Sequence, residues 1–317
     1  MSVNKIKILA PVDRVEEILP LIKAGADEFF CGAIIDNKNL ACKRAKGVNK
    51  SNLANLTELK KLVKIIKKRK KKIFLVLNIP HDGIEALKVI EKNIKKIKEI
   101  GVDAIIVGNI NLVDKFKKSN LEIIASSLLE VKNKETAELL IKEFGVKRII
   151  LDRQITLNDI EDIISEFPET EFETFVMISG CRSLNSACKR YLATGKKYLH
   201  IHLCNSPFLI DKKDRTLFLN SLNKKIIAKR LRMPSRCCGA CALFQFKKFN
   251  ISSVKIVGRG IPTNIKIENI KFVKQTLNIL EKGYSQRKFY QGTEKLFEKT
   301  FGEKCRRQYC YYPHFFN

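Results

Sequence analysis

Short, nearly continuous apolar runs alternate with amphipathic stretches along most of the chain. "KIFLVLNIP" (72–80) precedes "GIEALKVIEKNIKKIKEIG", and "KRIILD" (147–152) precedes "TLNDIEDIISEF". Runs of the first kind are typical of strands covered on both faces, whereas the second kind has the spacing of helices. Eight strand-like runs occur, at 5–12, 28–34, 72–80, 103–109, 121–127, 147–152, 172–180 and 252–260.

Eight strand–helix units favour a closed (β/α)8 barrel of the TIM type. An open doubly wound sheet is the alternative, because a count of eight can be wrong by one. The 317 residues, 45% of them hydrophobic, suffice for a real core. We therefore expect a single barrel domain over residues 1–317.

The regular alternation breaks between the seventh and eighth strands. Residues 181–251 replace the usual helix, and we interpret them as a metal-binding insertion, since long insertions at a barrel rim are usually functional. The tail at 285–317 is rich in aromatic residues and is expected to pack on the barrel. Eight cysteines lie in these two segments, namely Cys181, Cys188, Cys204, Cys237, Cys238, Cys241, Cys305 and Cys310.

Composition adds two expectations. The formal net charge is +28, which suits binding to tRNA or rRNA, although many of the lysines lie on predicted helix faces where solvated charge needs no partner. The chain has no apolar run long enough to span a bilayer and no recognisable signal peptide, so we expect a cytoplasmic protein. In that reducing compartment the cysteines are better read as metal ligands than as disulfides.

Barrel enzymes place their chemistry at the carboxyl ends of the strands. We take Asn78, Arg153 and Arg259 as candidate catalytic residues there, and the two arginines could clamp a carboxylate. Each polar residue taken singly is equally explained as a turn or a helix cap. Their recurrence at one rim favours a site made of Cys31, Gly32, Asn78, His81, Asn109, Ser126, Ser127, Arg153, Cys181 and Arg259. For Cys31 itself we expect a buried core position.

The cysteine spacing leaves the metal open. Structural zinc favours two short knuckles, and only "CGAC" (238–241) has that form. The pattern C-x6-C-x15-C followed by "CCGAC" better fits an iron–sulfur cluster, which accepts thiolates from distant loops. A rival zinc site would use His200, His202 and Cys204, which alternate along one possible strand face. A peptidase remains possible, for example through a dyad of His81 with a cysteine, but neither an HExxH nor a Gly-x-Ser-x-Gly motif is present.

Several stretches resemble peptidase family U32, the collagenase-like proteins. They are "ILAPVDRVEEILPLIKAGADEFFCGA", "FETFVMISGCRSLNSACKRY" with its C-x6-C pair, and "VKIVGRG" near the end. Within that family the chain is most similar to single-domain members related to the anaerobic ubiquinone-hydroxylation proteins U and V. The resemblance implies a barrel.

The resemblance also implies a [4Fe-4S] cluster, with zinc as the alternative metal. Its ligands would be Cys181, Cys188, Cys204 and Cys238, with Cys241 as the alternative to Cys238. The implied activity is oxygen-independent hydroxylation of a quinone precursor or an RNA pyrimidine, with a prephenate-like carboxylate as hydroxyl donor. Some relatives act as heterodimers, so a non-catalytic, metal-containing partner subunit is a further alternative.

Three features depart from the family pattern. One is "MIS" (177–179), which replaces the small polar and histidine residues that usually precede the first signature cysteine. Gln154 stands where a glutamate is usual, and Phe208 replaces a cysteine of a C-x3-C pair. Cys42 resembles a ligand position of protein V. Together with Cys305 and Cys310, Cys42 could belong to a second metal site.

Overall fold

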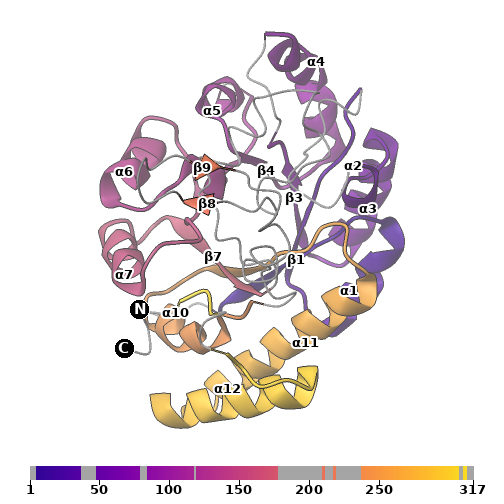
Figure 1. The fold of residues 1–317 in the computed structure, drawn as a ribbon. Helices are drawn as coiled ribbons and strands as arrows, with labels where there is room; N and C mark the ends of the chain where they lie inside the picture. The colour runs from indigo at the N-terminus through magenta and orange to yellow at the C-terminus, as the bar shows by residue number, and fades with distance from the viewer. Residues whose placement is uncertain are drawn as a thin grey trace.

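Eight parallel strands close into a barrel in the computed structural model (Figure 1). The structure describes residues 5–36, 48–78, 84–117, 119–177, 209–210, 217–218, 237–306 and 310–312. The order around the barrel is β1-β10-β7-β6-β5-β4-β3-β2, and β2 pairs back with β1. The predicted barrel is thus confirmed, and the alternative of an open sheet is wrong.

The strands coincide with the eight apolar runs. They are β1 (Lys7–Pro11), β2 (Glu28–Cys31), β3 (Lys72–Val76), β4 (Ala104–Val107), β5 (Ile123–Ala125), β6 (Arg148–Ile150), β7 (Glu171–Met177) and β10 (Ser253–Ile256). Most of their residues are buried, because helices cover the outer face and side chains fill the interior. Cys31 is fully buried in β2, as predicted.

Helices surround the barrel, and their polar neighbours define where they begin. Asn55 caps α3 by accepting a hydrogen bond from the Glu58 amide, and Thr156 and Asp159 form a reciprocal capping box on α7. The described α-helices are α1 (Ile18–Ala24), α2 (Val48–Ser51), α3 (Leu56–Lys68), α4 (Ile84–Ile100), α5 (Ile110–Lys117), α6 (Lys134–Lys142), α7 (Leu157–Glu166), α10 (Leu243–Lys248), α11 (Thr263–Leu280) and α12 (Gln286–Phe301).

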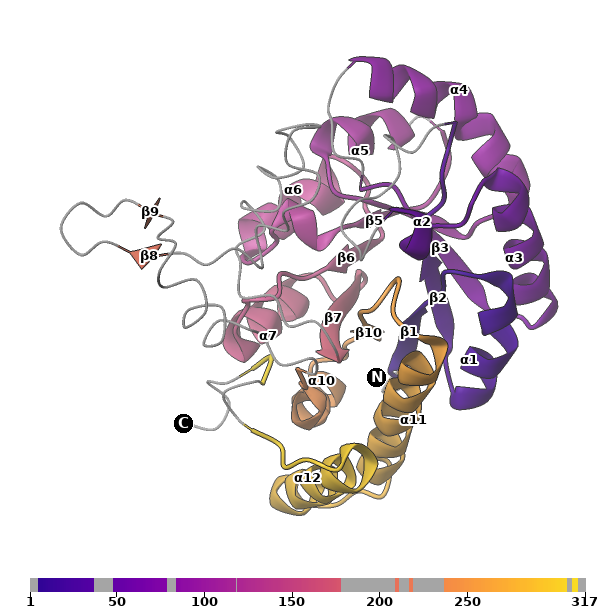
Figure 2. The ribbon, with the colours of Figure 1, turned by 45° about the vertical axis from the view of Figure 1, so that its right-hand side comes forward.

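Between β7 and β10 the described residues form no long crossover helix. They comprise the two-stranded antiparallel pair β8 (Leu209–Ile210) and β9 (Leu217–Phe218), a 3-10 turn at Ala240–Ala242, and the short helix α10. After β10, α11 packs against α1, and α12 lies alongside α11 (Figure 2). No described helix is long and apolar enough to cross a membrane.

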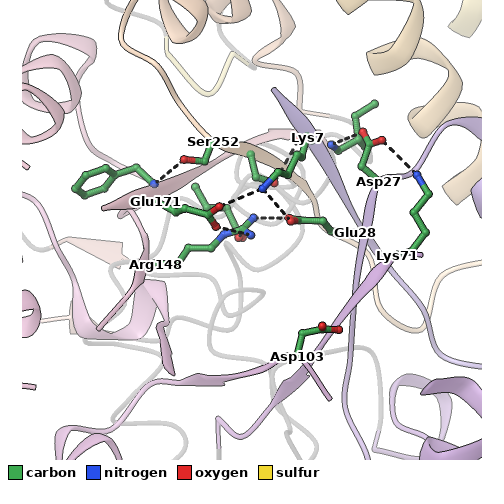
Figure 3. Close-up of polar contacts among 12 residues, drawn as sticks. Lys7, Asp27, Glu28, Lys71, Asp103, Arg148, Glu171 and Ser252 are labelled. Atoms are coloured by element: carbon green, nitrogen blue, oxygen red, sulfur yellow. Dashed lines mark hydrogen bonds and ion pairs between the residues drawn. The ribbon is translucent and has the colours of Figure 1, made fainter. Parts of the chain in front are cut away.

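A network of charged side chains fills the interior near the amino-terminal end of the barrel (Figure 3). The buried Arg148 guanidinium lies 2.8 Å from a Glu28 oxygen, 3.0 Å from a Glu173 oxygen and 3.4 Å from a Glu171 oxygen. Lys255 continues the network by binding Glu173 at 2.8 Å. Because each buried charge faces an opposite one, this end is a packed, neutralised plug.

Candidate functional site

Asn78, at the end of β3, forms the first polar group of the carboxyl-terminal rim. Its amide nitrogen donates to the Ser126 hydroxyl at 3.0 Å, and Ser126 in turn accepts from the Leu128 amide. Gly108, after β4, leaves space for the Asn78 side chain, because a β-carbon at Gly108 would lie 2.6 Å from Asn78 Oδ1. That buried oxygen has no hydrogen-bond partner among the described residues, so it can still accept one.

Arg259 follows β10 and reaches across the mouth toward β2. Its Nη1 donates to Asn52 Oδ1 at 3.5 Å. Both groups occupy the space above Gly32, where a β-carbon would lie 2.0 Å from the Asn52 oxygen and 2.2 Å from the arginine nitrogen. Gly32 is therefore required for this contact, which also explains the glycine directly after the strand.

A buried ion cluster anchors the loop that carries Arg259. The Gly260 amide donates to Asp13 at 2.6 Å, and Lys266, fully buried on α11, bridges Asp13 and Glu17. Burial acts to raise the pKa of Glu17, but hydrogen bonds and charge from Lys266 outweigh it and lower that pKa. The loops after β1 and β10 are thus fixed to each other, which positions Arg259.

Arg153, after β6, lies against an aromatic stack. Its guanidinium is 4.9 Å from the centre of the Phe175 ring, and Phe175 stacks on Tyr311 of the tail at 6.2 Å. A cation over a ring face gains about 0.5–2 kcal/mol, depending on its desolvation. Arg153 Nε is buried without a hydrogen-bond partner in the described part of the chain. The side chain is therefore held in place and can still bind an anion.

The "CCGAC" segment lies against the end of β7. Cys238 bridges Met177 in antiparallel fashion, and the Gly239 amide donates to the Val176 carbonyl at 2.8 Å. Cys237, Cys238 and Cys241 are all buried. Burial raises the pKa of the Cys238 thiol well above its ordinary value, the Ala240 amide acts to lower it, and three neighbouring cysteines raise it further.

Residues 310–312 of the tail pack against the "CCGAC" segment and β7. Cys310 pairs with Cys238 in a parallel bridge, and the Tyr311 amide donates to the Cys238 carbonyl at 3.0 Å. The Tyr312 hydroxyl accepts from Thr174 at 2.5 Å and donates to the Phe175 carbonyl at 3.0 Å. This docking is specific because the buried phenol has both of its hydrogen bonds.

The strand order determines which candidates are neighbours. Since β7 lies between β6 and β10, the cysteine segment at its end stands between the strands that carry Arg153 and Arg259. Asn78 lies farther around the rim, on β3. Several other predicted residues lie outside the described part of the chain, namely Cys42, His81, Cys181, Cys188, His200, His202 and Cys204. Their convergence with Cys238 or Cys241 stays a prediction.

Within the described residues, no three histidine, cysteine, aspartate or glutamate side chains are arranged to hold a metal ion as they stand. The six described cysteines form no disulfide. The thiolate donor set of the "CCGAC" segment fits an iron–sulfur cluster or zinc chemically. The imidazoles of the rival zinc triad lie outside the described part.

Sequence reasoning missed Asn52, Tyr311 and Tyr312 as parts of this rim. Asn52 precedes a helix by a few residues and reads as a capping residue, and nothing local marks it as the partner of Arg259. The adjacent tyrosines beside Cys310 were a usable signal, because paired aromatic residues in a tail favour docking. Their contact on β7 required the structure.

Comparison with known proteins identifies the family of the chain. The model of peptidase family U32 matches residues 13–315. The tRNA hydroxylation protein P of Escherichia coli is 29% identical over 120 residues, which cover 37% of this chain and 26% of that protein. Its Helicobacter pylori counterpart from strain J99 is 26% identical over 189 residues, covering 58% and 42%. An uncharacterized protease of Methanocaldococcus jannaschii is 28% identical over 194 residues, covering 58% and 43%.

The chain therefore matches less than half the length of each of these curated relatives. Among solved structures, the U32 peptidase Mk0906 aligns with a TM-score of 0.53 at 11% identity, covering 82% of this chain and 95% of that one. At that identity the likeness supports the fold alone. The family match spans nearly the whole chain, and so the protein belongs to peptidase family U32.

Proposed function

We propose that this protein takes part in the oxygen-independent hydroxylation of a pyrimidine in tRNA or rRNA. The observation that carries the proposal is the rim itself, where Arg153 after β6 and Arg259 after β10 flank the cysteine segment at the end of β7. Relatives named as tRNA hydroxylation proteins favour RNA over a quinone precursor. The net charge of +28 supports the same choice, since phosphate binding releases counterions.

A [4Fe-4S] cluster would be held by Cys181, Cys188, Cys204 and one cysteine of the "CCGAC" segment. The chemistry of the described cysteines supports this assignment. They are buried at a strand end, and the Ala240 amide donates to Cys238 Sγ at 3.4 Å, the kind of bond that stabilises thiolate charge. When bound, the cluster would supply one-electron redox chemistry beside the barrel mouth.

The arginines would bind the hydroxyl donor. Replacing a ring C–H by C–OH removes two electrons from the ring, and the donor accepts them as it gives up its oxygen. A prephenate-like donor carries carboxylates, which guanidinium groups hold with two parallel hydrogen bonds. Arg259, fixed by its anchored loop, and Arg153, fixed on Phe175, would orient such a donor, and Asn78 Oδ1 could accept a hydrogen bond from the pyrimidine.

Nothing in the described residues favours the peptidase alternative. All four histidines lie outside them, so the structure offers no cysteine–histidine pair and no metal-bound water in its support. A heterodimer with a related subunit remains compatible with the proposal, because such a partner could complete the RNA-binding surface. In that case the purified chain alone would bind the cluster without forming product.

The proposal is tested in a strain that lacks the gene. Digested tRNA and rRNA are compared by mass spectrometry, and a pyrimidine nucleoside about 16 mass units heavier than its parent, as adding one oxygen requires, should be lost. Wild-type protein should restore it, and Arg259→Ala should not. Arg287→Ala on α12 is the matched control, because it removes an exposed arginine distant in the sequence from the rim loop and should restore it fully.

Unchanged hydroxylated nucleosides in the deletion strain would contradict the proposed function. If a hydroxylated quinone precursor disappears instead, the reaction class stands and the RNA assignment is wrong. If a peptide-cleaving activity of the purified protein survives removal of iron, the peptidase alternative is favoured.

A further inference from the structure

Two short cysteine pairs, distant in the sequence, meet at the end of β7. Cys238 and Cys241 form a C-x2-C pair in the turn before α10, and Cys305 and Cys310 form a C-x4-C pair after α12. Both spacings fall within the range found in structural zinc sites, where each pair supplies two thiolates.

Backbone pairing brings the two pairs together. Cys238 and Cys310 are directly paired residues in the parallel bridge, so their side chains leave the same face of this small ladder. Cys241 and Cys305 act electrostatically on Cys238, and Cys305 and Cys237 act on Cys310, which agrees with this pairing and adds Cys237 to the group. The buried contacts of Tyr312 with Thr174 and Phe175 hold the tail in this register.

One cysteine of each pair accepts a hydrogen bond from a backbone amide. The Ala240 amide donates to Cys238 Sγ at 3.4 Å, and the Tyr312 amide donates to Cys310 Sγ at 3.4 Å. In both cases the donor lies two residues after the cysteine. Amide hydrogen bonds of this kind stabilise the negative charge that a ligating sulfur carries.

We propose that Cys238, Cys241, Cys305 and Cys310 bind a structural Zn²⁺ that fastens the carboxyl-terminal tail to the barrel rim. As they stand, no three of these side chains form a metal-binding group among the described residues, so binding must draw the sulfurs together by rotation about their side-chain bonds. Each thiol loses its proton as zinc binds, because the thiolate is the ligand. The ligand of this site is thus a divalent zinc ion.

The zinc would act on the rim through the tail. Tyr311, beside Cys310, stacks on Phe175, which carries the Arg153 guanidinium on its ring. Fastening Cys310 to Cys238 therefore fixes the aromatic support of Arg153. Loss of zinc should loosen this support without unfolding the barrel, whose strands pair independently of the tail.

The assignment also selects the fourth cluster ligand, a consequence that rests on the proposed function. Cys237 directly precedes Cys238 and acts electrostatically on Cys310, so it lies beside the same group of cysteines. If Cys238 and Cys241 bind zinc, Cys237 is the residue of this segment left to complete the cluster with Cys181, Cys188 and Cys204. The eight cysteines would then divide into two sets of four.

Metal analysis of the full chain purified without oxygen tests both assignments separately. Wild-type protein should hold about one zinc per chain, as a site of four thiolates requires. Cys305→Ser with Cys310→Ser should lose the zinc and keep the iron, and Cys237→Ser should lose the iron and keep the zinc. Lys304→Ala is the control, because it removes an exposed side chain beside Cys305 but no thiol, and should keep both metals.

A second measurement needs no variant. Zinc should protect Cys238, Cys241, Cys305 and Cys310 of the wild-type protein from alkylation, as read by mass spectrometry, and a zinc chelator should remove that protection. Full alkylation with zinc present, or wild-type protein without zinc, overturns the inference. Zinc that depends on Cys305 and Cys310 in a protein that never binds iron would instead refute the proposed cluster and leave the zinc site standing.

Discussion

The two ends of the barrel treat their polar side chains differently. At the amino-terminal end, Arg148 makes ion pairs with three carboxylates, and Lys255 neutralises Glu173 deeper in the interior. Buried polar atoms without a hydrogen bond among the described residues occur at both ends, but those of Glu28, Arg148 and Glu173 belong to ion-paired groups. At the carboxyl-terminal rim, Asn78 Oδ1 and Arg153 Nε belong to groups that form no ion pair with another described residue. The charged side chains at the amino-terminal end bind one another, whereas those at the rim can still bind a ligand.

This difference separates stability from function within one fold. A buried charge that lacks its partner costs several kcal/mol. Removing one member of a buried ion-pair network therefore destabilises the fold strongly. A buried acceptor left over at a rim costs less and is tolerated where a ligand can satisfy it. The rim is accordingly the place where substitutions should alter chemistry more than folding.

The largest effect is expected from Arg148→Met at the amino-terminal end. Among the described residues, the change leaves Glu28 paired only with Lys7 at 3.5 Å and Glu173 paired only with Lys255, which should lower the free energy of unfolding by about 3–5 kcal/mol. Chemical denaturation followed by circular dichroism measures it. Arg153→Met is the matched rim variant and should cost about 1 kcal/mol, since it removes mainly a cation–ring contact. Equal losses in the two variants would remove the distinction between the ends.

Gly32→Ala should have the next largest effect, and at the rim. The added methyl group would overlap Asn52 Oδ1 and Arg259 Nη1, so both must move, at about 1–3 kcal/mol of strain. Hydroxylated nucleoside in the complemented deletion strain should fall at least as far as with Arg259→Ala. Gly292→Ala on α12 is the control, because its new methyl group meets only ordinary contacts. Full activity of Gly32→Ala would show that Arg259 need not hold this position.

The barrel could be predicted from sequence because its signal is local and repeated. Each strand is a short apolar run bounded by helix caps and turns, and eight of them leave few arrangements. The charged plug was not predicted. Glu173 within "FETF" and Lys255 within "VKI" stand out as charges in buried strands, but the sequence separation of 82 hides that they form a pair.

The candidate site was predictable only in outline. Strand ends mark Asn78, Arg153 and Arg259 as rim residues, and the strand order then makes the two arginines flank β7. What holds each side chain was not visible, since Arg259 meets Asn52 at a sequence separation of 207. The pairing of Cys310 with Cys238 likewise depends on the tail crossing β7, which no periodicity encodes.

A smaller effect is expected from acid. Burial acts to raise the pKa of Glu171, but Arg148 and Lys7 outweigh it and hold that pKa below its ordinary value of 4.5. The associated stabilisation is therefore present above pH 4.5 and is lost as the pH falls through the lowered pKa. Lys7→Met should reduce this loss, because the pKa of Glu171 returns toward its ordinary value. Unfolding free energies between neutral and acidic pH, compared with Lys61→Met on α3, would check it. An unchanged pH dependence in Lys7→Met would exclude Lys7 as a source of the shift.

The smallest change in stability is expected from Asn78→Ala. It removes one hydrogen bond to Ser126, and the freed hydroxyl still accepts from the Leu128 amide, so the free energy of unfolding should fall by only about 1 kcal/mol. The hydroxylated nucleoside should nevertheless decline strongly, since the variant deletes the acceptor at the rim. Ser126→Ala is the matched control, because it breaks the same bond and leaves Asn78 Oδ1 in place. If both variants reduce product equally, Asn78 supports the rim structurally, and the contrast between the two ends rests on the arginines alone.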